Sequence, residues 1–322
     1  MIKPSVYVTR DIGSEAITLL KNHCDVTIWN KPVPVTRDEL IKNVAGKDAL
    51  LCLLTDKIDS EVLNAAGTNL KIIATMSVGF DHLDVKEIKK RNIKVGYTPN
   101  VLTDATAELT VALLLATSRR LLEGSEEART GGWKAWSPFW MCGPTLSHST
   151  VGIVGFGRIG QQVAQRLKSF NIKNLLYTGH SEKKEGLEIG AKFVSLDELL
   201  RESDFVIATC ALTPETANMF NDLSFKKMKP SAVFVNTSRG GVVDQDALIR
   251  ALKEKTIWAA GLDVTTPEPL STDSELFNLK NCVVLPHIAS ATIETRNTMA
   301  MLSVKNILSG LRNKQMPSEL II

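Results

Sequence analysis

A glycine-rich turn between an apolar run and a helical pattern most constrains the fold of this chain. Residues 151–154 are predicted to form a buried strand, and Gly155, Gly157 and Gly160 follow it in the spacing G-x-G-x-x-G. Glycines at these places allow a tight turn, the approach of a phosphate to bare backbone, and close packing of the next helix. That helix would direct free N–H groups and the positive end of its dipole at the phosphate. The pattern predicts a dinucleotide-binding strand–turn–helix unit.

Length and composition predict about two α/β domains and no nucleic-acid or membrane partner. The 322 residues carry a formal net charge of only +3, too small to indicate a polyanionic partner. No signal-peptide core follows Met1, and the longest uncharged helical run, residues 109–118, is too short to span a bilayer. The five cysteines are scattered without a C-x-x-C pair, which favours a reducing compartment over disulfides or zinc. A cytoplasmic protein is therefore expected.

Short β-branched runs alternate with helical patterns on both sides of one long helix, predicted over residues 103–120. This alternation predicts parallel sheets in two tandem α/β units. A final helix over residues 293–311 is expected to pack back onto the first unit. The expected strands are 6–9, 26–29, 50–54, 72–75, 94–97, 151–154, 175–178, 205–209, 232–236, 259–263 and 283–285. The expected helices of the first half are 14–21, 36–44, 60–65 and 85–91, the second with capping-box spacing at Thr36.

Three polar side chains follow predicted strands of the second half. Arg239 follows the strand 232–236, Glu268 lies just after 259–263, and His287 follows 283–285. Because open α/β sheets bind ligands outside the carboxyl ends of their strands, one site could collect all three. Arginine can hold a carboxylate through two hydrogen bonds, and histidine beside a carboxylate can transfer a proton near neutral pH. Each residue alone has an ordinary structural interpretation, but their order after a dinucleotide turn favours a catalytic site.

With these motifs in place, the chain resembles the D-isomer-specific 2-hydroxyacid dehydrogenases over nearly its whole length. The resemblance rests on residues 77–84, 155–160, 236–240, 261–264, 267–269 and 285–287. Within the family, residues 97–103, 131–136 and 316–320 are most similar to animal glyoxylate/hydroxypyruvate reductases. The family fold implies two Rossmann-like, doubly wound parallel-sheet domains with a cleft between them. Residues 1–102 and 291–322 would form a discontinuous substrate domain, and residues 103–290 the dinucleotide-binding domain.

The resemblance also implies catalytic roles for the three polar side chains. Arg239 would bind the substrate carboxylate and polarise the C2 carbonyl. His287 would protonate the carbonyl oxygen as hydride reaches C2, and Glu268 would orient His287 and stabilise its imidazolium.

Further substrate contacts are implied outside these three residues. The backbone N–H groups of Val78 and Gly79 would bind the carboxylate from the other domain, so that closure completes the site. Ser290 is expected to contact the substrate or the carboxamide end of the cofactor. His82 is expected to be structural rather than catalytic.

The turn that would hold the adenosine ribose lacks an acid. NAD sites usually carry one about 20 residues past the first glycine, to bind the 2′-hydroxyl, whereas residues 176–181 carry none. His180, Ser181, Lys183 and Lys184 could instead receive a 2′-phosphate, although Glu182 lies among them, so NADPH is predicted with NADH as a weaker alternative. Asp263 would either lie near the nicotinamide or be purely structural. The expected cofactor-binding residues are Gly155, Gly157, Arg158, Ile159, Gly160, His180, Ser181, Lys183, Ala211, Thr237 and Asp263, and no metal is expected.

Residues 131–143 are rich in aromatic side chains, namely Trp133, Trp136, Phe139 and Trp140. Such an apolar loop would be a costly exposed patch on a monomer. The family's homodimer buries this region, so a homodimer is predicted, with Trp136 reaching the partner's substrate pocket and limiting substrate size.

The leading hypothesis is NADPH-dependent reduction of glyoxylate to glycolate and of hydroxypyruvate to D-glycerate. Phosphoglycerate dehydrogenase is an alternative, disfavoured by the missing ribose acid and by the absence of an extra regulatory domain before Ile322. A dinucleotide-sensing corepressor-like binding protein of the same fold is the alternative from another class. Such proteins keep the same three polar residues, but no basic patch or disordered tail indicates a chromatin role, which favours the enzyme.

Overall fold

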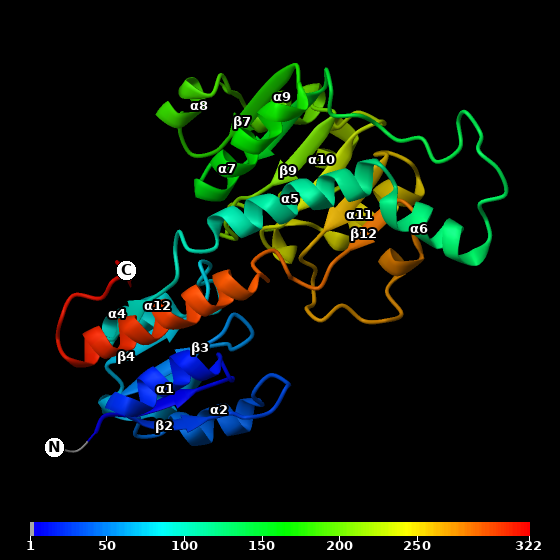
Figure 1. The fold of residues 1–322 in the computed structure, drawn as a ribbon. Helices are drawn as coiled ribbons and strands as arrows, with labels where there is room; N and C mark the ends of the chain where they lie inside the picture. The colour runs from blue at the N-terminus through cyan, green and yellow to red at the C-terminus, as the bar shows by residue number, and fades with distance from the viewer. Residues whose placement is uncertain (1–2) are drawn as a thin grey trace. The chain divides into compact units, whose positions relative to one another are not determined.

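The computed structural model describes residues 3–322, which divide into two compact α/β units. Unit 1 comprises the described residues up to Leu102 together with Ala291–Ile322, and unit 2 comprises Thr103–Ser290. Each unit contains one sheet whose strands are parallel, apart from a short antiparallel strand at one edge of unit 1 (Figure 1). The prediction of two parallel-sheet α/β domains is therefore confirmed.

The sheet of unit 1 has six strands in the order β13-β5-β4-β3-β1-β2, with β13 antiparallel to β5. Its strands are β1 (Ser5–Val8), β2 (Asp25–Ile28), β3 (Ala49–Cys52), β4 (Ile72–Thr75), β5 (Lys94–Gly96) and β13 (Glu319–Leu320). Its helices are α1 (Ser14–His23), α2 (Arg37–Val44), α3 (Ser60–Ala66), α4 (Val85–Lys90) and α12 (Ile293–Leu311). Every residue of the central strands β3 and β4 is buried, as expected of parallel strands covered on both faces.

Two helices of unit 1 begin and pack as the sequence predicts. The hydroxyl of Thr36 caps α2 by accepting a hydrogen bond from the Glu39 amide (3.4 Å), which confirms the predicted start of that helix. Helix α12 has the predicted bounds and packs against α1 and β4, so the last helix does return to the first unit.

The sheet of unit 2 has seven parallel strands in the order β12-β11-β10-β9-β6-β7-β8. The strands are β6 (Thr150–Val154), β7 (Asn174–Thr178), β8 (Lys192–Phe193), β9 (Phe205–Ala208), β10 (Val233–Asn236), β11 (Ala259–Leu262) and β12 (Cys282–Val284). The helices are α5 (Thr103–Ser118), α6 (Leu121–Thr130), α7 (Arg158–Leu167), α8 (Lys184–Glu188), α9 (Leu196–Glu202), α10 (Asp222–Lys227) and α11 (Gln245–Lys253). The strand order reverses between β6 and β9, and such a switch point is where open α/β sheets bind ligands.

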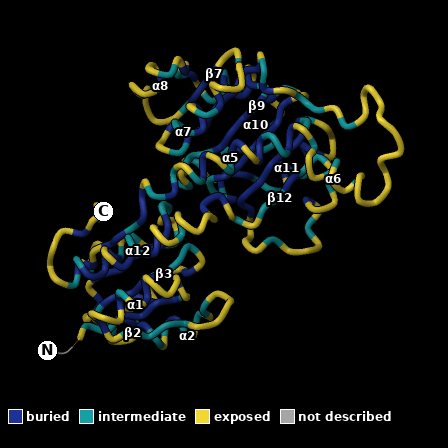
Figure 2. The backbone as a smooth tube through the Cα atoms, in the orientation of Figure 1, coloured by how far each residue is buried: buried dark blue, intermediate teal, exposed yellow. Residues whose placement is uncertain are grey.

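The single long helix predicted over residues 103–120 is wrong at its end. Helix α5 stops at Ser118, and Arg120 takes a left-handed conformation (φ 52°) before α6 begins. The Arg120 guanidinium forms two 2.8 Å hydrogen bonds with the Glu123 carboxylate, which fixes the bend. No residue of α6 is buried, and the backbone of α6 and of the segment after it is largely exposed (Figure 2).

None of the helices that residues 3–322 form has both the length and the apolar character needed to cross a membrane.

We expect Asn306 to stabilise unit 1, because its buried side chain joins α12 to two other segments. Its amide nitrogen donates to the Tyr97 carbonyl (3.0 Å), and its oxygen accepts from the Ser318 amide (2.9 Å). Asn306→Ala leaves both backbone groups unpaired and should lower the free energy of unfolding by about 1–3 kcal/mol. Urea denaturation measures this change, with Lys305→Ala on the exposed face as the control. An equal effect of both substitutions would contradict this role.

Candidate active site

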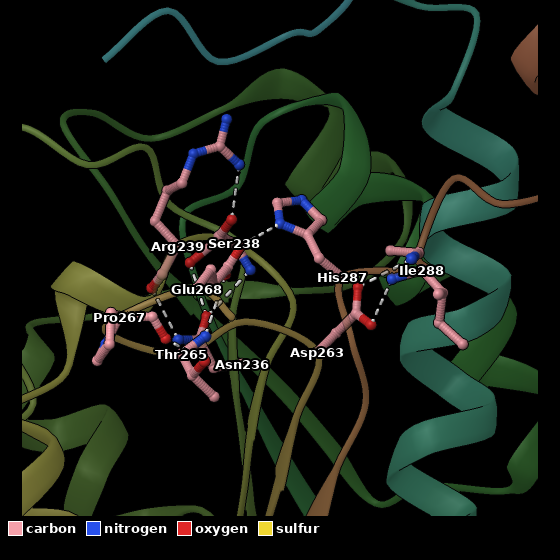
Figure 3. A network of polar contacts seen from close by, with 10 residues as sticks. Asn236, Ser238, Arg239, Asp263, Thr265, Pro267, Glu268, His287 and Ile288 are labelled. Atoms are coloured by element: carbon pink, nitrogen blue, oxygen red, sulfur yellow. Dashed lines mark hydrogen bonds and ion pairs between the residues drawn. The ribbon is translucent and has the colours of Figure 1, made fainter. Parts of the chain in front are cut away.

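The loops after β10, β11 and β12 carry Arg239, Glu268 and His287 respectively, and these three strands are neighbours in the sheet. The first two loops lie in direct contact. A Cβ atom at Gly240 would come within 1.9 Å of the Thr265 carbonyl oxygen, so only glycine allows this approach. The three side chains therefore extend from one edge of the sheet (Figure 3).

Asn236, the last residue of β10, fixes the loop that carries Arg239. Its buried side-chain oxygen accepts hydrogen bonds from the Ser238 amide (3.0 Å) and hydroxyl (2.8 Å). Its side-chain nitrogen donates to the Arg239 carbonyl (2.8 Å). The Arg239 guanidinium in turn donates to the Ser238 carbonyl (2.8 Å) through Nη1. The guanidinium thus projects from a loop whose backbone is held on both sides (Figure 3).

Glu268 and His287 form a hydrogen-bonded pair. His287 Nδ1 lies 2.8 Å from Glu268 Oε2, and Glu268 Oε1 accepts a hydrogen bond from the Thr265 amide (3.1 Å). Burial by itself would raise the pKa of Glu268, but the contacts with His287, Thr265 and Arg239 outweigh it and lower that pKa. Because an ionised carboxylate only accepts, Nδ1 carries the hydrogen of this bond and Nε2 remains to exchange a proton with a ligand.

Asp263 holds the backbone that carries His287. Its carboxylate accepts hydrogen bonds from the amides of Ile288 and Ala289, each 2.8 Å long, and its carbonyl accepts one from the His287 amide (2.8 Å). The residue is completely buried, and burial raises the pKa of its carboxyl, an effect that the two amides partly offset. His287 takes a left-handed backbone conformation (φ 56°), which is uncommon for a residue other than glycine. The three hydrogen bonds from this loop to Asp263 stabilise that conformation.

The glycine turn after β6 has the shape of a phosphate-binding site. Gly155 has φ +95°, and a Cβ there would come within 2.5 Å of the Cys210 backbone. A Cβ at Gly160 would lie 2.3 Å from the Gly155 carbonyl oxygen, whereas a Cβ at Gly157 would meet open space. Helix α7 begins at Arg158 without a side-chain cap or an acid in its first turn. A pyrophosphate therefore fits beside Gly157, on the free amides of this helix.

The other predicted cofactor residues of unit 2 lie at the ends of neighbouring strands. His180, Ser181 and Lys183 are exposed beyond β7, where the Lys183 amide donates to the Tyr177 hydroxyl (2.8 Å). Ile159 is partly buried and packs against the core. The remaining two have protein partners, because the Thr237 hydroxyl lies 2.8 Å from that of Thr110 and the Ala211 carbonyl accepts from the Thr216 hydroxyl (2.7 Å).

The remaining predicted site residues are Val78, Gly79, Trp136 and Ser290. Val78 and Gly79 belong to unit 1 and lie in the loop after β4. Trp136 follows α6 and is 81% exposed, while Ser290 is buried at the end of unit 2. Within residues 3–322, no group of three or more His, Cys, Asp or Glu side chains could hold a metal ion.

The residues that support the three catalytic candidates, above all Asn236 and Thr265, were not predicted from the sequence. Asn236 carried a usable signal, because it is a polar residue at the end of an otherwise apolar strand. Thr265 carried none, since its contribution comes from a backbone amide.

A model of the NAD-binding domain of D-isomer-specific 2-hydroxyacid dehydrogenases matches residues 111–289, more than half of the chain. The chain belongs to this family. It is therefore an oxidoreductase with a nicotinamide-dinucleotide-binding domain, as predicted.

Comparisons with individual proteins agree with this family. The chain is 55% identical over 318 residues to human glyoxylate reductase/hydroxypyruvate reductase, covering 98% of this chain and 97% of the human protein. A structure from Thermus thermophilus superposes with a TM-score of 0.92 at 42% identity, covering 98% of this chain and all of that one. A third relative is the NADPH-dependent glyoxylate/hydroxypyruvate reductase of Sinorhizobium meliloti, solved with NADP and malonate. It superposes with a TM-score of 0.86 at 29% identity, covering 99% of this chain and 97% of that one.

We expect two glycine substitutions in the turn to separate cofactor binding from folding. Gly157→Ala puts a methyl group in open space, so it should leave the melting temperature unchanged and weaken dinucleotide binding at least about tenfold by blocking the phosphate. Gly160→Ala forces a methyl group against the Gly155 carbonyl and should lower the melting temperature. Fluorescence titration and calorimetry measure the two effects. Full dinucleotide affinity in the Gly157 variant would argue against this position for the phosphate.

Proposed function

We propose that this enzyme uses NADPH to reduce glyoxylate to glycolate and hydroxypyruvate to D-glycerate. The pairing of ionised Glu268 with His287, on the same sheet edge as Arg239, is the observation that supports it most directly. The names of the human and Sinorhizobium meliloti relatives support the choice of these two substrates.

The reaction adds a hydride to C2 of the keto acid and a proton to its carbonyl oxygen. When bound, the reduced nicotinamide supplies the hydride. Arg239 binds the substrate carboxylate through two parallel N–H groups, and its charge polarises the carbonyl. His287 donates the proton from Nε2, while Glu268 accepts a hydrogen bond from Nδ1 and stabilises the imidazolium until the transfer.

We propose further substrate contacts from the amides of Val78 and Gly79 and from Ser290. The two amides bind the carboxylate together with Arg239, and Ser290 contacts the substrate or the carboxamide end of the cofactor. Asp263 acts through the His287 loop, since its carboxylate is already occupied by two amides. Trp136 from a second copy limits the size of the substrate.

Steady-state assays with two keto acids and two cofactors test the proposed function. NADPH oxidation should be fast with glyoxylate or hydroxypyruvate, and the kcat/KM ratio of NADPH to NADH should exceed one. Rapid turnover of other 2-keto acids alone would overturn the substrate assignment. Tight dinucleotide binding without any turnover would instead support the corepressor-like alternative.

Replacing Glu268 should change the pH dependence of the reduction. The wild-type carboxylate is ionised at neutral pH because its pKa is lowered, and its charge favours protonated His287. Glu268→Gln removes that charge and with it the stabilisation of the imidazolium, so the alkaline limb of the reductive kcat/KM profile moves to lower pH. The wild-type profile, measured in the same buffers, is the reference. An unshifted limb would exclude electrostatic coupling between the two residues.

NADPH preference should depend on Lys183. Its amine forms no ion pair with any residue of 3–322, whereas neighbouring Lys184 lies 3.4 Å from Glu188. Lys183→Gln should raise the KM for NADPH roughly five- to tenfold and leave that for NADH nearly unchanged, since only NADPH carries the 2′-phosphate. Lys184→Gln is the matched control. Equal effects on both cofactors would remove Lys183 from phosphate recognition.

We propose a homodimer that buries α6 and the segment after it, in a protein of the cytoplasm. Leu121, Leu122, Trp136 and Phe139 are 56%, 50%, 81% and 90% exposed, a large apolar surface for a single chain. Wild-type protein should sediment as a dimer, and Phe139→Glu should shift it toward monomer. Leu223→Glu, at a similarly exposed leucine on α10, should not. A wild-type monomer would exclude both the dimer and the action of Trp136 on a partner.

A further inference from the structure

In unit 1, four polar groups are joined in series beside the loop after β4, where Thr75 is the last residue of the strand. The Ser77 hydroxyl lies 2.7 Å from the Gly79 carbonyl oxygen and 2.7 Å from the Thr75 hydroxyl. The Thr75 hydroxyl also lies 3.0 Å from His82 Nε2. Thr75 and Ser77 are both buried. We call this continuous series from His82 through Thr75 and Ser77 to the Gly79 carbonyl the hydroxyl relay.

The hydroxyl relay has only one consistent direction of donation. A carbonyl oxygen can only accept, so Ser77 donates its single hydroxyl hydrogen to Gly79. Thr75 must then donate its own hydrogen to Ser77, and His82 must donate from Nε2 to Thr75. His82 therefore carries a hydrogen on Nε2, as it does in one neutral tautomer and in the protonated ring.

Groups beside the hydroxyl relay favour this direction and fix its ends. Cys52 is in hydrogen-bonding contact with Thr75, and burial raises the pKa of its thiol well above the ordinary value, so no thiolate competes for the Thr75 hydrogen. The His82 carbonyl accepts from the Ile58 amide, and the Ser77 carbonyl accepts from the Thr98 amide, both at 2.9 Å.

The amides next to the relay are available to a ligand. The Gly79 carbonyl is occupied by Ser77, whereas the N–H groups of Val78 and Gly79 donate to no protein group within residues 3–322. Two successive free backbone N–H groups are a typical binding site for an anion. Neither residue is fully buried, so the site remains accessible.

We propose that His82, Thr75 and Ser77 are positioning residues for the substrate carboxylate. By fixing the Gly79 carbonyl, the hydroxyl relay orients the amides of Val78 and Gly79 for the anion. This inference rests on the proposed function, because it deepens the part of it that assigns those amides to the carboxylate. It also gives His82 a role in substrate affinity that acts through Thr75 and Ser77.

Substitutions that break the relay should weaken carboxylate binding more than chemistry. Thr75→Val and Ser77→Ala should each raise the KM for glyoxylate roughly five- to tenfold, the usual value of one lost hydrogen bond, with a smaller change in kcat. Thr75→Ser should restore KM because it keeps the hydroxyl. Calorimetric titration with oxalate in the presence of NADP⁺ should show the same pattern without turnover, while affinity for NADPH stays unchanged.

Thr98→Val is the matched control. Thr98 is fully buried next to the same loop, but its hydroxyl has no hydrogen-bond partner, so its loss should leave KM unchanged. Oxalate affinity and KM in the Thr75 and Ser77 variants equal to those of Thr98→Val would overturn the positioning role while leaving the reductase intact. If oxalate affinity falls as expected in the Thr75 and Ser77 variants but the wild-type protein does not turn over glyoxylate, the reductase proposal alone is overturned.

Discussion

The buried residue Asp263 connects the ends of three strands, and the proposed active site depends on that connection. Its amide donates to the carbonyl of Asn236 at the end of β10, while its carbonyl and carboxylate accept three amides from the loop that begins at His287. A carboxylate this buried is costly unless hydrogen bonds compensate it. Here the compensating donors are the amides that set the position of the imidazole. The same hydrogen bonds therefore offset the cost of burying the carboxylate and fix the geometry of the site.

The site also follows from the order of the strands in unit 2. The strand order reverses between β6 and β9, and the glycine turn lies at the carboxyl end of β6. The loops of β10, β11 and β12 lie on the β9 side of that reversal, at the same edge of the sheet. A parallel sheet thus places the glycine turn and the loops of Arg239, Glu268 and His287 along one edge, although more than a hundred residues separate Gly155 from His287 along the chain.

Buried strands and helices with one buried face could be predicted from the sequence. The buried apolar runs of β4 and β6 and the bounds of α12 were predicted to within one residue, and that of β3 to within two, because burial on both faces or along one helical face leaves a local pattern. The bend at Arg120 was not, since it depends on one left-handed residue held by Glu123. The pairing of Glu268 with His287 was implied by the family resemblance, but the amide of Thr265 that orients the carboxylate leaves no side-chain signal.

The account stands on His287 as the proton donor, held by Glu268 and by the Asp263 loop. The most direct test is the turnover of His287→Ala with saturating NADPH and glyoxylate, together with its affinity for NADPH. The account predicts a fall in kcat of about 10²–10⁴-fold, the usual contribution of general acid catalysis, with NADPH affinity unchanged. Turnover close to that of the wild type would contradict it, because another group or water would then donate the proton.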